Sequence, residues 1–333
     1  MFRAYWISAF AWFACAVSTG ASCHAALVFT FDYSGNTPGV GFLDPVTGAA
    51  RQNALSTAGT LFSNLFSSHF SNSAALTFSV TSTYDNTAST LASAGSNSVS
   101  APGTYGGAEV VRNKVIFGND LNGSTADGIV DVNWGYNWEL DPNTLAVAPG
   151  IGESYDFYAA AFHEFTHALG FGSLISGTPG HDGNGSGAQG SSTPGSWAKW
   201  DQFLADASNS SLVNGATFEV NQTAFANAQT NGGFFTGANA VAAYGGRVPL
   251  FVDPDVSHLD ESTFATPTSA TNFMMKPQRD YGPQEARVWS GLEVGILRDL
   301  GYTAVPEPSS AMFVLLVLAG MSFSRFKRNH ATA

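Results

Sequence analysis

A pair of histidines with a glutamate between them stands in the segment SYDFYAAAFHEFTHALG, residues 154–170. In a helix His163 and His167 lie one turn apart on the same face, and Glu164 lies beside them. Two neutral imidazoles so placed can bind one Zn²⁺, and the carboxylate can take a proton from a zinc-bound water. A chain of this composition would contain the His-Glu-x-x-His pattern by chance about once in 250 cases. The spacing therefore predicts metal-assisted hydrolysis, with His163 and His167 as ligands and Glu164 as general base.

A catalytic zinc usually takes three protein ligands and keeps its fourth position for water, so another ligand must come from elsewhere in the chain. Without the two terminal segments discussed below, the following histidines remain: His69, His163, His167, His181 and His258. We expect His69 to be a surface residue. Glu261 and Glu293 are carboxylate alternatives for the third ligand, although neither lies in an obvious second helix motif.

His181 and His258 are the two histidine candidates for the third ligand. His181 follows His167 by 14 residues, but its surroundings, GTPGHDGNGSG, are rich in glycine and restrain a side chain poorly. His258 lies 91 residues after His167, and its neighbours Asp260 and Glu261 can orient it. Proximity in sequence thus favours His181, whereas rigidity favours His258.

The histidine pair requires a helix that packs with its opposite face on the core. Ser154 can cap such a helix, Gly170 can end it, and the residues between them lack Gly and Pro. An apolar stripe lies on nearly the opposite face from the histidines: Tyr158, Phe162, Phe165 and Leu169. We therefore expect a helix over 154–170 that turns both imidazoles into a cleft.

The remaining elements predict an α+β fold. Segments with the composition of strands are 27–34, 75–82, 114–118 and 129–140. Helices are expected at 50–68, 197–207 and 290–300, the last one ended by Gly301. Loops are expected at 89–107, with room for one short strand, and at 177–194. The first half is therefore a sheet with at least one covering helix.

Composition and charge exclude several classes of protein. Hydrophobic residues make up 44% of the chain and charged residues 11%, which excludes a charge-rich disordered chain or a coiled coil. Residues 26–304 contain 9 Lys or Arg and 24 Asp or Glu, a formal charge of −15, so we expect no nucleic-acid partner. Both cysteines, Cys15 and Cys23, precede this body, which therefore has no disulfide or thiolate ligand.

Both ends of the chain have the composition of targeting segments. Residues 1–25 contain Arg3, an apolar run and small residues, the order of a secretory signal peptide cleaved near Ala25; a buried N-terminal helix is the alternative. Residues 305–333 contain Pro-Glu-Pro, a short apolar stretch over 311–323 and a basic end. This tail resembles the PEP-CTERM signal of Gram-negative bacteria. The resemblance implies export, sorting by an exosortase to the cell surface or extracellular matrix, and transient membrane contact through the tail only, with a plain C-terminal anchor as the alternative.

Four segments over most of residues 155–303 carry a second resemblance: HEFTHALGFGS, SHLDE, FMMKP and GILRDLGY. They are similar to the leishmanolysin-type metzincins and related bacterial secreted metallopeptidases. The resemblance implies that His258 is the third zinc ligand and that Met275 belongs to the methionine turn beneath the metal. It also implies a zinc-dependent endopeptidase whose substrate is an extended polypeptide.

The resemblance further implies one catalytic domain over residues 26–304. Its N-terminal subdomain, 26–170, would hold a twisted mixed sheet, a backing helix and the active-site helix. Its C-terminal subdomain, 171–304, would hold an insertion, the methionine turn and the final helix. The sequence departs from the compact metzincin pattern at Ser173, where the third histidine would stand, and it lacks the cysteines of the family, which excludes a cysteine-switch latency. No tyrosine stands two residues after Met275, so an extra tyrosine ligand is not expected.

Weaker patterns have simpler interpretations. Two polar groups are similar to calcium loops: Asp182, Asn184 and Ser186, and Asp120, Asn122, Asp127 and Asp131. We expect polar turns in both places, with Ca²⁺ binding as the alternative. A set of aromatic residues at helical spacing is expected in the core: Trp197, Trp200 and Phe203. The alternative function is a metal-binding surface or matrix protein of weak or lost activity, against which Glu164 argues, because metal binding alone needs no carboxylate there.

Overall fold

The computed structural model of the protein describes residues 26–176, 180–252, 256–264, 273–283 and 286–305. The predicted signal peptide, and all of the predicted sorting tail except Val305, lie outside these residues. Within them, no helix has both the length and the apolar character needed to cross a membrane. The described residues form a mixed α+β fold, as the sequence predicted.

A mixed sheet forms the core of the N-terminal half. Its strands are β1 (Leu27–Asp32), β2 (Ala74–Thr83), β3 (Ala92–Ser96) and β5 (Gly128–Asn133). Their order is β1-β2-β5-β3; β1 and β5 run parallel to β2, and β3 pairs antiparallel with β5 at one edge. The strands expected at 27–34 and 75–82 are confirmed. The strand expected over 129–140 divides into β5 and β6 (Trp138–Glu139).

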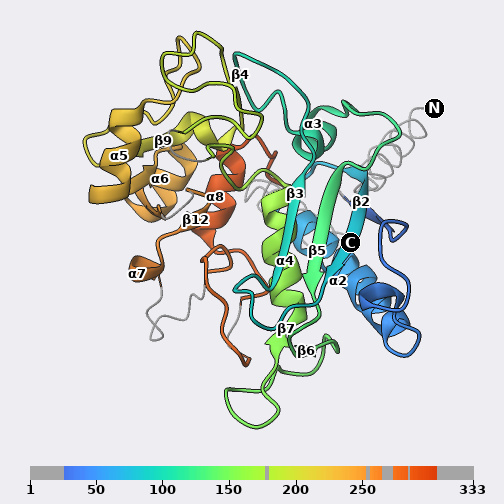
Figure 1. The fold of residues 1–333 in the computed structure, drawn as a ribbon. Coiled ribbons are helices and arrows are strands. Elements are labelled where there is room, and N and C mark those ends of the chain that lie inside the picture. Colours follow the sequence, from blue (N-terminus) through green and yellow to red (C-terminus); the bar gives the residue numbers. More distant parts are fainter. Residues whose placement is uncertain (1–25, 177–179, 253–255, 265–272, 284–285, 306–333) are drawn as a thin grey trace, which may run out of the picture.

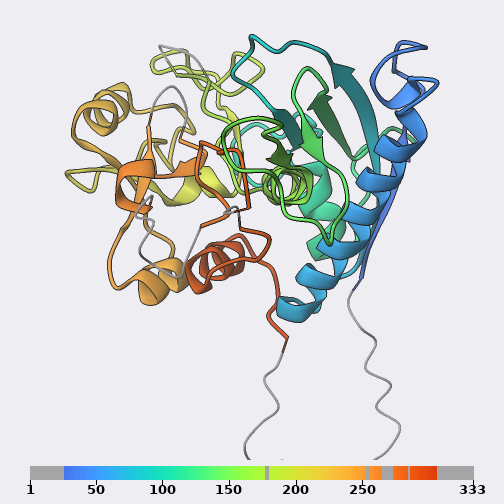
Figure 2. The ribbon, with the colours of Figure 1, turned by 90° about the horizontal axis from the view of Figure 1, so that it is seen from below.

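Helices α2 (Gly48–His69) and α4 (Phe157–Ala168) cover the same face of this sheet (Figures 1 and 2). Phe62 of α2 and Phe165 of α4 both pack against Phe29 of β1, with ring centroids 6.1 and 4.9 Å apart. The predicted apolar stripe of α4 is buried: Tyr158, Phe162, Phe165 and Leu169. Burying this stripe leaves the histidine pair on the side of α4 that faces away from the sheet.

Helix α3 (Val110–Phe117) replaces the strand predicted at 114–118. Val110, Val111 and Val115 are buried on one side of it, a helical spacing that begins before the predicted strand. Gly118 ends the helix at a φ of 71°, a left-handed conformation that glycine adopts without steric penalty. The β-branched residues of this segment therefore pack a helix, and the prediction of a strand was wrong.

The helix predicted over 197–207 was also wrong. The chain there forms β8 (Ser196–Trp197), a 3₁₀ turn η2 (Trp200–Phe203) and β9 (Leu204–Asp206). Trp197 and Trp200 are fully buried and Phe203 packs partly buried against the core, so their predicted place in the core is confirmed. A 3₁₀ turn already brings residues three apart to one side, and β9 is then held by pairing with β10 (Gly233–Phe235).

An antiparallel sheet of order β12-β11-β10-β9 organises the C-terminal half. Its other elements are β11 (Val248–Phe251), β12 (His258–Leu259), α5 (Gln222–Asn231), α6 (Ala238–Tyr244), α7 (Glu261–Phe264) and α8 (Gly291–Asp299). Helix α8 confirms the one predicted at 290–300: Ser290 and Glu293 form a capping box, and Gly301 follows at a φ of 107°.

Three short elements complete the frame around the site. Strand β4 (Thr104–Tyr105) lies with β3 in the segment predicted as a loop, and it pairs with β8 across the two halves. Strand β7 (Tyr155–Asp156) pairs with β6 just before α4 begins. The 3₁₀ turn η1 (Gly41–Leu43) precedes α2. The two halves are thus joined by strand pairing as well as by the chain after α4.

Candidate metal centre

Helix α4 is fixed at both ends. Oδ1 of Asp156 accepts hydrogen bonds from the backbone N–H groups of Tyr158 and Ala159, both at 3.0 Å, and Arg287 holds this carboxylate at 2.8 Å. The cap is therefore Asp156 and not the predicted Ser154, whose hydroxyl instead accepts from the N–H of Val147. Two residues after the helix, Gly170 has a φ of 95°, which confirms the predicted left-handed stop.

Three histidines meet beside this helix. Nε2 of His167 lies 3.0 Å from Nε2 of His163 and 3.1 Å from Nε2 of His258, and the latter two nitrogens are 3.3 Å apart. In the part of the chain that the structure describes, these residues form the group of His, Cys, Asp and Glu side chains able to hold one metal ion. Three converging imidazoles are a donor set that suits Zn²⁺ with one position left open.

Two of these histidines contact a backbone carbonyl through the other ring nitrogen. Nδ1 of His163 lies 2.7 Å from the oxygen of Met274, and Nδ1 of His167 lies 2.6 Å from the oxygen of Phe171. A carbonyl oxygen can only accept, so Nδ1 of His167 carries the proton and its Nε2 keeps its lone pair. Nε2 of His167 is therefore ready to bind a cation at the point where the rings converge.

The surroundings of His163 favour its neutral form. Burial holds the pKa of His163 well below 6.5, and the positive charge of Arg279 acts in the same direction. Nη2 of Arg279 lies 2.6 Å from Nδ1 of His163 and also donates to the carbonyl oxygen of Met274. Because only a neutral imidazole can act as a ligand, this environment suits metal binding.

His258 reaches the centre from the C-terminal half. It lies in β12 opposite Phe251 of β11, and the N–H of its neighbour Leu259 donates to the oxygen of Met275 at 2.9 Å. Met275 is fully buried, and its own N–H donates to Oε1 of Glu293 at 2.8 Å. The turn that carries Met275 is thus tied both to the strand of His258 and to the first turn of α8.

The other candidate ligands lie elsewhere. Glu293 uses its second oxygen to accept from the N–H of Ser290 in the capping box, and Glu261 lies 3.6 Å from Lys276. Nδ1 of His181 contacts the carbonyl of Asp182, the residue that follows it. The imidazole of His69, predicted at the surface, is half-buried against Trp289 with ring centroids 5.9 Å apart. None of these side chains belongs to the histidine group.

Glu164 lies next to the three imidazoles. Its Oε2 accepts from the N–H of Ala94 in β3 at 2.9 Å, and its Oε1 lies 4.0 Å from Nε2 of His163. Burial raises the pKa of Glu164 to about 8, although the Ala94 N–H and the charge of Arg279 oppose the shift. A divalent cation on the histidines would lower this pKa again. The carboxylate is therefore oriented toward the centre by the edge strand of the sheet.

The histidines and Glu164 line a cleft of about 930 Å³ between the two halves. One wall is the stretch 89–98, which contains the edge strand β3. The cleft is also lined by residues 172–174, Ser257, residues 277–279, Tyr136 and Tyr155. Every residue of β3 lines the cleft, so an extended chain can lie along that strand.

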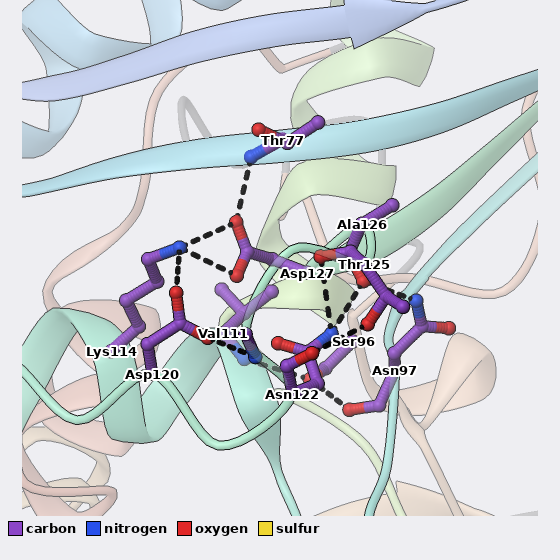
Figure 3. A network of polar contacts seen from close by, with 11 residues as sticks. Thr77, Ser96, Asn97, Val111, Lys114, Asp120, Asn122, Thr125, Ala126 and Asp127 are labelled. Carbon is purple, nitrogen blue, oxygen red and sulfur yellow. Dashed lines mark hydrogen bonds and ion pairs between the residues drawn. The ribbon is translucent and has the colours of Figure 1, made fainter.

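The two groups similar to calcium loops make hydrogen bonds or ion pairs within the protein, and Asp131 of the second group lies in strand β5 rather than in a turn. In the second group, Nζ of Lys114 lies 2.9 Å from Asp127 and 3.1 Å from Asp120, and Asp127 also accepts from the N–H of Thr77 at 2.7 Å (Figure 3). An ammonium group is therefore already paired with both of these carboxylates. In the first group, the carboxylate of Asp182 accepts from backbone N–H groups of its own loop and of β8.

Sequence reasoning missed several residues that support the centre. Asp156 could have been chosen as the helix cap, because an aspartate before an apolar run is as good a cap as a serine. The N–H of Ala94 and the carbonyls of Met274 and Phe171 gave no signal, because they are backbone groups brought close only by the fold. Arg279 follows Met275 by four residues, and its charge was not considered.

Comparison with known proteins gives no independent indication of function: no known family matches the chain, and no curated protein or solved structure matches it.

Proposed function

We propose that the protein is an exported zinc-dependent endopeptidase that hydrolyses peptide bonds in the cleft between its two halves. The observation that carries this proposal is the convergence of three Nε2 atoms, from His163, His167 and His258, beside the buried carboxylate of Glu164. Metal binding alone would need only the imidazoles. A carboxylate held at the same point adds the group that a hydrolytic reaction requires.

Each residue of the centre has a separate role in this reaction. His163, His167 and His258 would hold the metal through Nε2. Bound Zn²⁺ supplies a water whose pKa is lowered to about 7 and an electrophile that polarises the scissile carbonyl. Glu164 takes the proton of the attacking water and delivers it to the nitrogen of the leaving amine. The N–H of Ala94 keeps the carboxylate of Glu164 at the position from which it can do both.

The edge strand supports a polypeptide as the substrate. β3 is the last strand of its sheet, so one side of its backbone faces the cleft rather than another strand. An extended peptide can therefore bind by adding a strand to β3 through main-chain hydrogen bonds to groups other than the Ala94 N–H, which Glu164 accepts. The residues of β3 are small (ASAGS), which leaves room for the side chains of such a peptide.

The family resemblance and the targeting segments complete the proposal. A sheet with the antiparallel strand at its edge, the active-site helix and a buried Met275 behind the third histidine are consistent with a metzincin of the leishmanolysin type. The predicted signal peptide and PEP-CTERM tail support export and sorting to the surface or matrix of a Gram-negative bacterium. An exosortase would be the partner that recognises the tail.

The proposal is tested on the purified protein by metal analysis and by digestion of casein or gelatin. We expect about one equivalent of zinc, loss of hydrolysis on chelation and its return when Zn²⁺ is added back. Hydrolysis that is indifferent to chelation would overturn the metal mechanism. Stoichiometric zinc without any peptide hydrolysis would instead support a metal-binding surface protein.

A further inference from the structure

The loop that follows α4 contacts the ligand His167 and the residue that precedes the ligand His258. The carbonyl of Phe171 meets Nδ1 of His167 at 2.6 Å, and the N–H of Ser173 donates to Oγ of Ser257 at 3.1 Å. Ser257 directly precedes His258 in the chain. This loop therefore links the second ligand, which comes from α4, to the third ligand, which comes from β12.

A buried carboxylate holds this loop in place. Asp201 is only 1% exposed, and its oxygens accept from Oγ of Ser173 at 2.6 Å, from the N–H of Leu174 at 3.1 Å and from the N–H of Ala198 at 2.9 Å. Three donors of the protein thus converge on one side chain of the 3₁₀ turn η2. They fix the loop after α4 relative to the C-terminal half.

The same turn also holds the segment before His258. Nε1 of Trp200 donates to the carbonyl of Val256 at 2.9 Å, and the Trp200 ring packs on Phe171 with centroids 4.5 Å apart. Trp200 and Asp201 are consecutive, so η2 reaches both the carbonyl that orients His167 and the chain that delivers His258. A shift of this turn would move both ligands.

We propose that Asp201 and Ser257 are positioning residues of the metal centre, which act through the loop after α4 to bring Nε2 of His167 and of His258 to one point. The inference rests on the proposed zinc centre and adds residues that are not metal ligands. It also gives a role to Ser173, which stands where the compact metzincin pattern has its third histidine. The N–H of Ser173 binds Ser257, the residue before the distant ligand His258. His167 and His258 are 91 residues apart, and a metal ion tolerates only small displacements of its ligands. Hydrogen bonds that fix the two segments relative to each other are therefore needed.

Zinc affinity and the visible absorption of Co²⁺-substituted protein test the proposal without using activity. Ser257→Ala removes the hydroxyl that accepts from the N–H of Ser173. Asp201→Asn replaces one of the two carboxylate oxygens, which together accept from three donors, with an NH₂ group that cannot accept. We expect each variant to bind zinc about 10- to 100-fold more weakly in competition with a chromophoric chelator, as outer residues of metal sites usually show. The Co²⁺ band, which reports ligand geometry, should change, and Ser257→Thr should restore both affinity and band.

Asp206→Asn is the matched control. Asp206 is 3% exposed and accepts from the N–H of Ser210 and from the side chain of Asn227, but it lies outside the cleft. We expect a loss of stability without a change in zinc affinity. An unchanged affinity and band in Ser257→Ala would overturn the inference, and this variant decides the matter even if Asp201→Asn fails to fold. A parent protein that binds no zinc would refute the proposed centre itself, which separates the two failures.

Discussion

In the proposed reaction, Glu164 is the residue of the centre whose role is chemical rather than structural. Glu164→Gln keeps the shape of the side chain and an oxygen that can accept from Ala94, but it cannot take a proton. We expect zinc content to stay near one equivalent while peptide hydrolysis falls by at least ~10², the usual share of a general base. Paired zinc analysis and peptide cleavage check this, with Glu219→Gln, outside the cleft, as the control. Activity within a few-fold of the parent would contradict the assigned role.

The third ligand can be assigned by comparing two histidines. His258 has its Nε2 3.1 Å from that of His167, whereas Nδ1 of His181 contacts the carbonyl of Asp182 in its own loop. We expect His258→Ala to lose zinc and hydrolysis together and His181→Ala to retain both. Metal content by atomic spectroscopy beside peptide cleavage distinguishes the two. The reverse outcome would remove the leishmanolysin-type interpretation of residues 258–277.

The residues of the site differed in how far the sequence could predict them. The roles of His163, Glu164 and His167 depend on one helical turn, so local spacing was enough to propose them together. His258 depends on a segment 91 residues away folding back. Proximity in sequence favoured His181, whereas local rigidity and the family resemblance favoured His258. The cap moved from Ser154 to Asp156 because both residue types cap helices and only the pairing of β6 with β7 sets where α4 begins.

At the level of elements, Glu109 joins the start of α3 to η2. Its Oε2 accepts from the N–H of Lys199 at 2.8 Å, and burial raises the pKa of Glu109 from 4.5 to about 7, against the opposing charges of Arg112 and Lys199. The folded chain therefore keeps this proton over a pH range in which the unfolded chain has released it. The contribution of Glu109 to the free energy of unfolding is greatest below pH 4.5 and declines as the pH rises toward 7.

Glu109→Gln should remove this pH dependence. Its amide oxygen can still accept from Lys199, and the side chain no longer ionises. Relative to the variant, the parent should lose up to about 1.4 kcal/mol of unfolding free energy per pH unit between 4.5 and 7. Urea unfolding of both proteins at pH 5 and pH 8 measures the difference, and the effect of pH on metal binding cancels between them. Parallel pH profiles would show that Glu109 is ionised in the folded protein.

The two wrong predictions of secondary structure share a physical cause. In 114–118 the β-branched residues favoured a strand, but the buried positions begin at Val110 and follow a helical spacing. In 197–207 the aromatic spacing favoured a helix, but β9 pairs with β10, a partner outside any local window. Strand pairing and burial depend on distant segments, so propensity alone misjudged both elements, whereas α2 and α8 carried enough local signal.

At the scale of the molecule, the candidate centre joins the two halves. His163 and His167 belong to α4, which packs on the N-terminal sheet, and His258 belongs to the C-terminal sheet. A metal ion bound by all three would tie the halves together at the cleft, in addition to the pairing of β4 with β8. The unfolded chain cannot present these ligands together, so metal binding must stabilise the folded state.

Chemical unfolding at a series of free zinc concentrations measures this linkage. For the parent, each tenfold increase in free zinc above the Kd should add about 1.4 kcal/mol to the free energy of unfolding, and a concentration of 100 Kd should add about 2.7 kcal/mol. Glu164→Gln should show the full increase, because Glu164 is not a ligand, whereas His258→Ala should show little at the same concentrations. If His258→Ala responded to zinc as strongly as the parent, the metal would be held within one half of the molecule, and the cleft would not be closed by a shared ion.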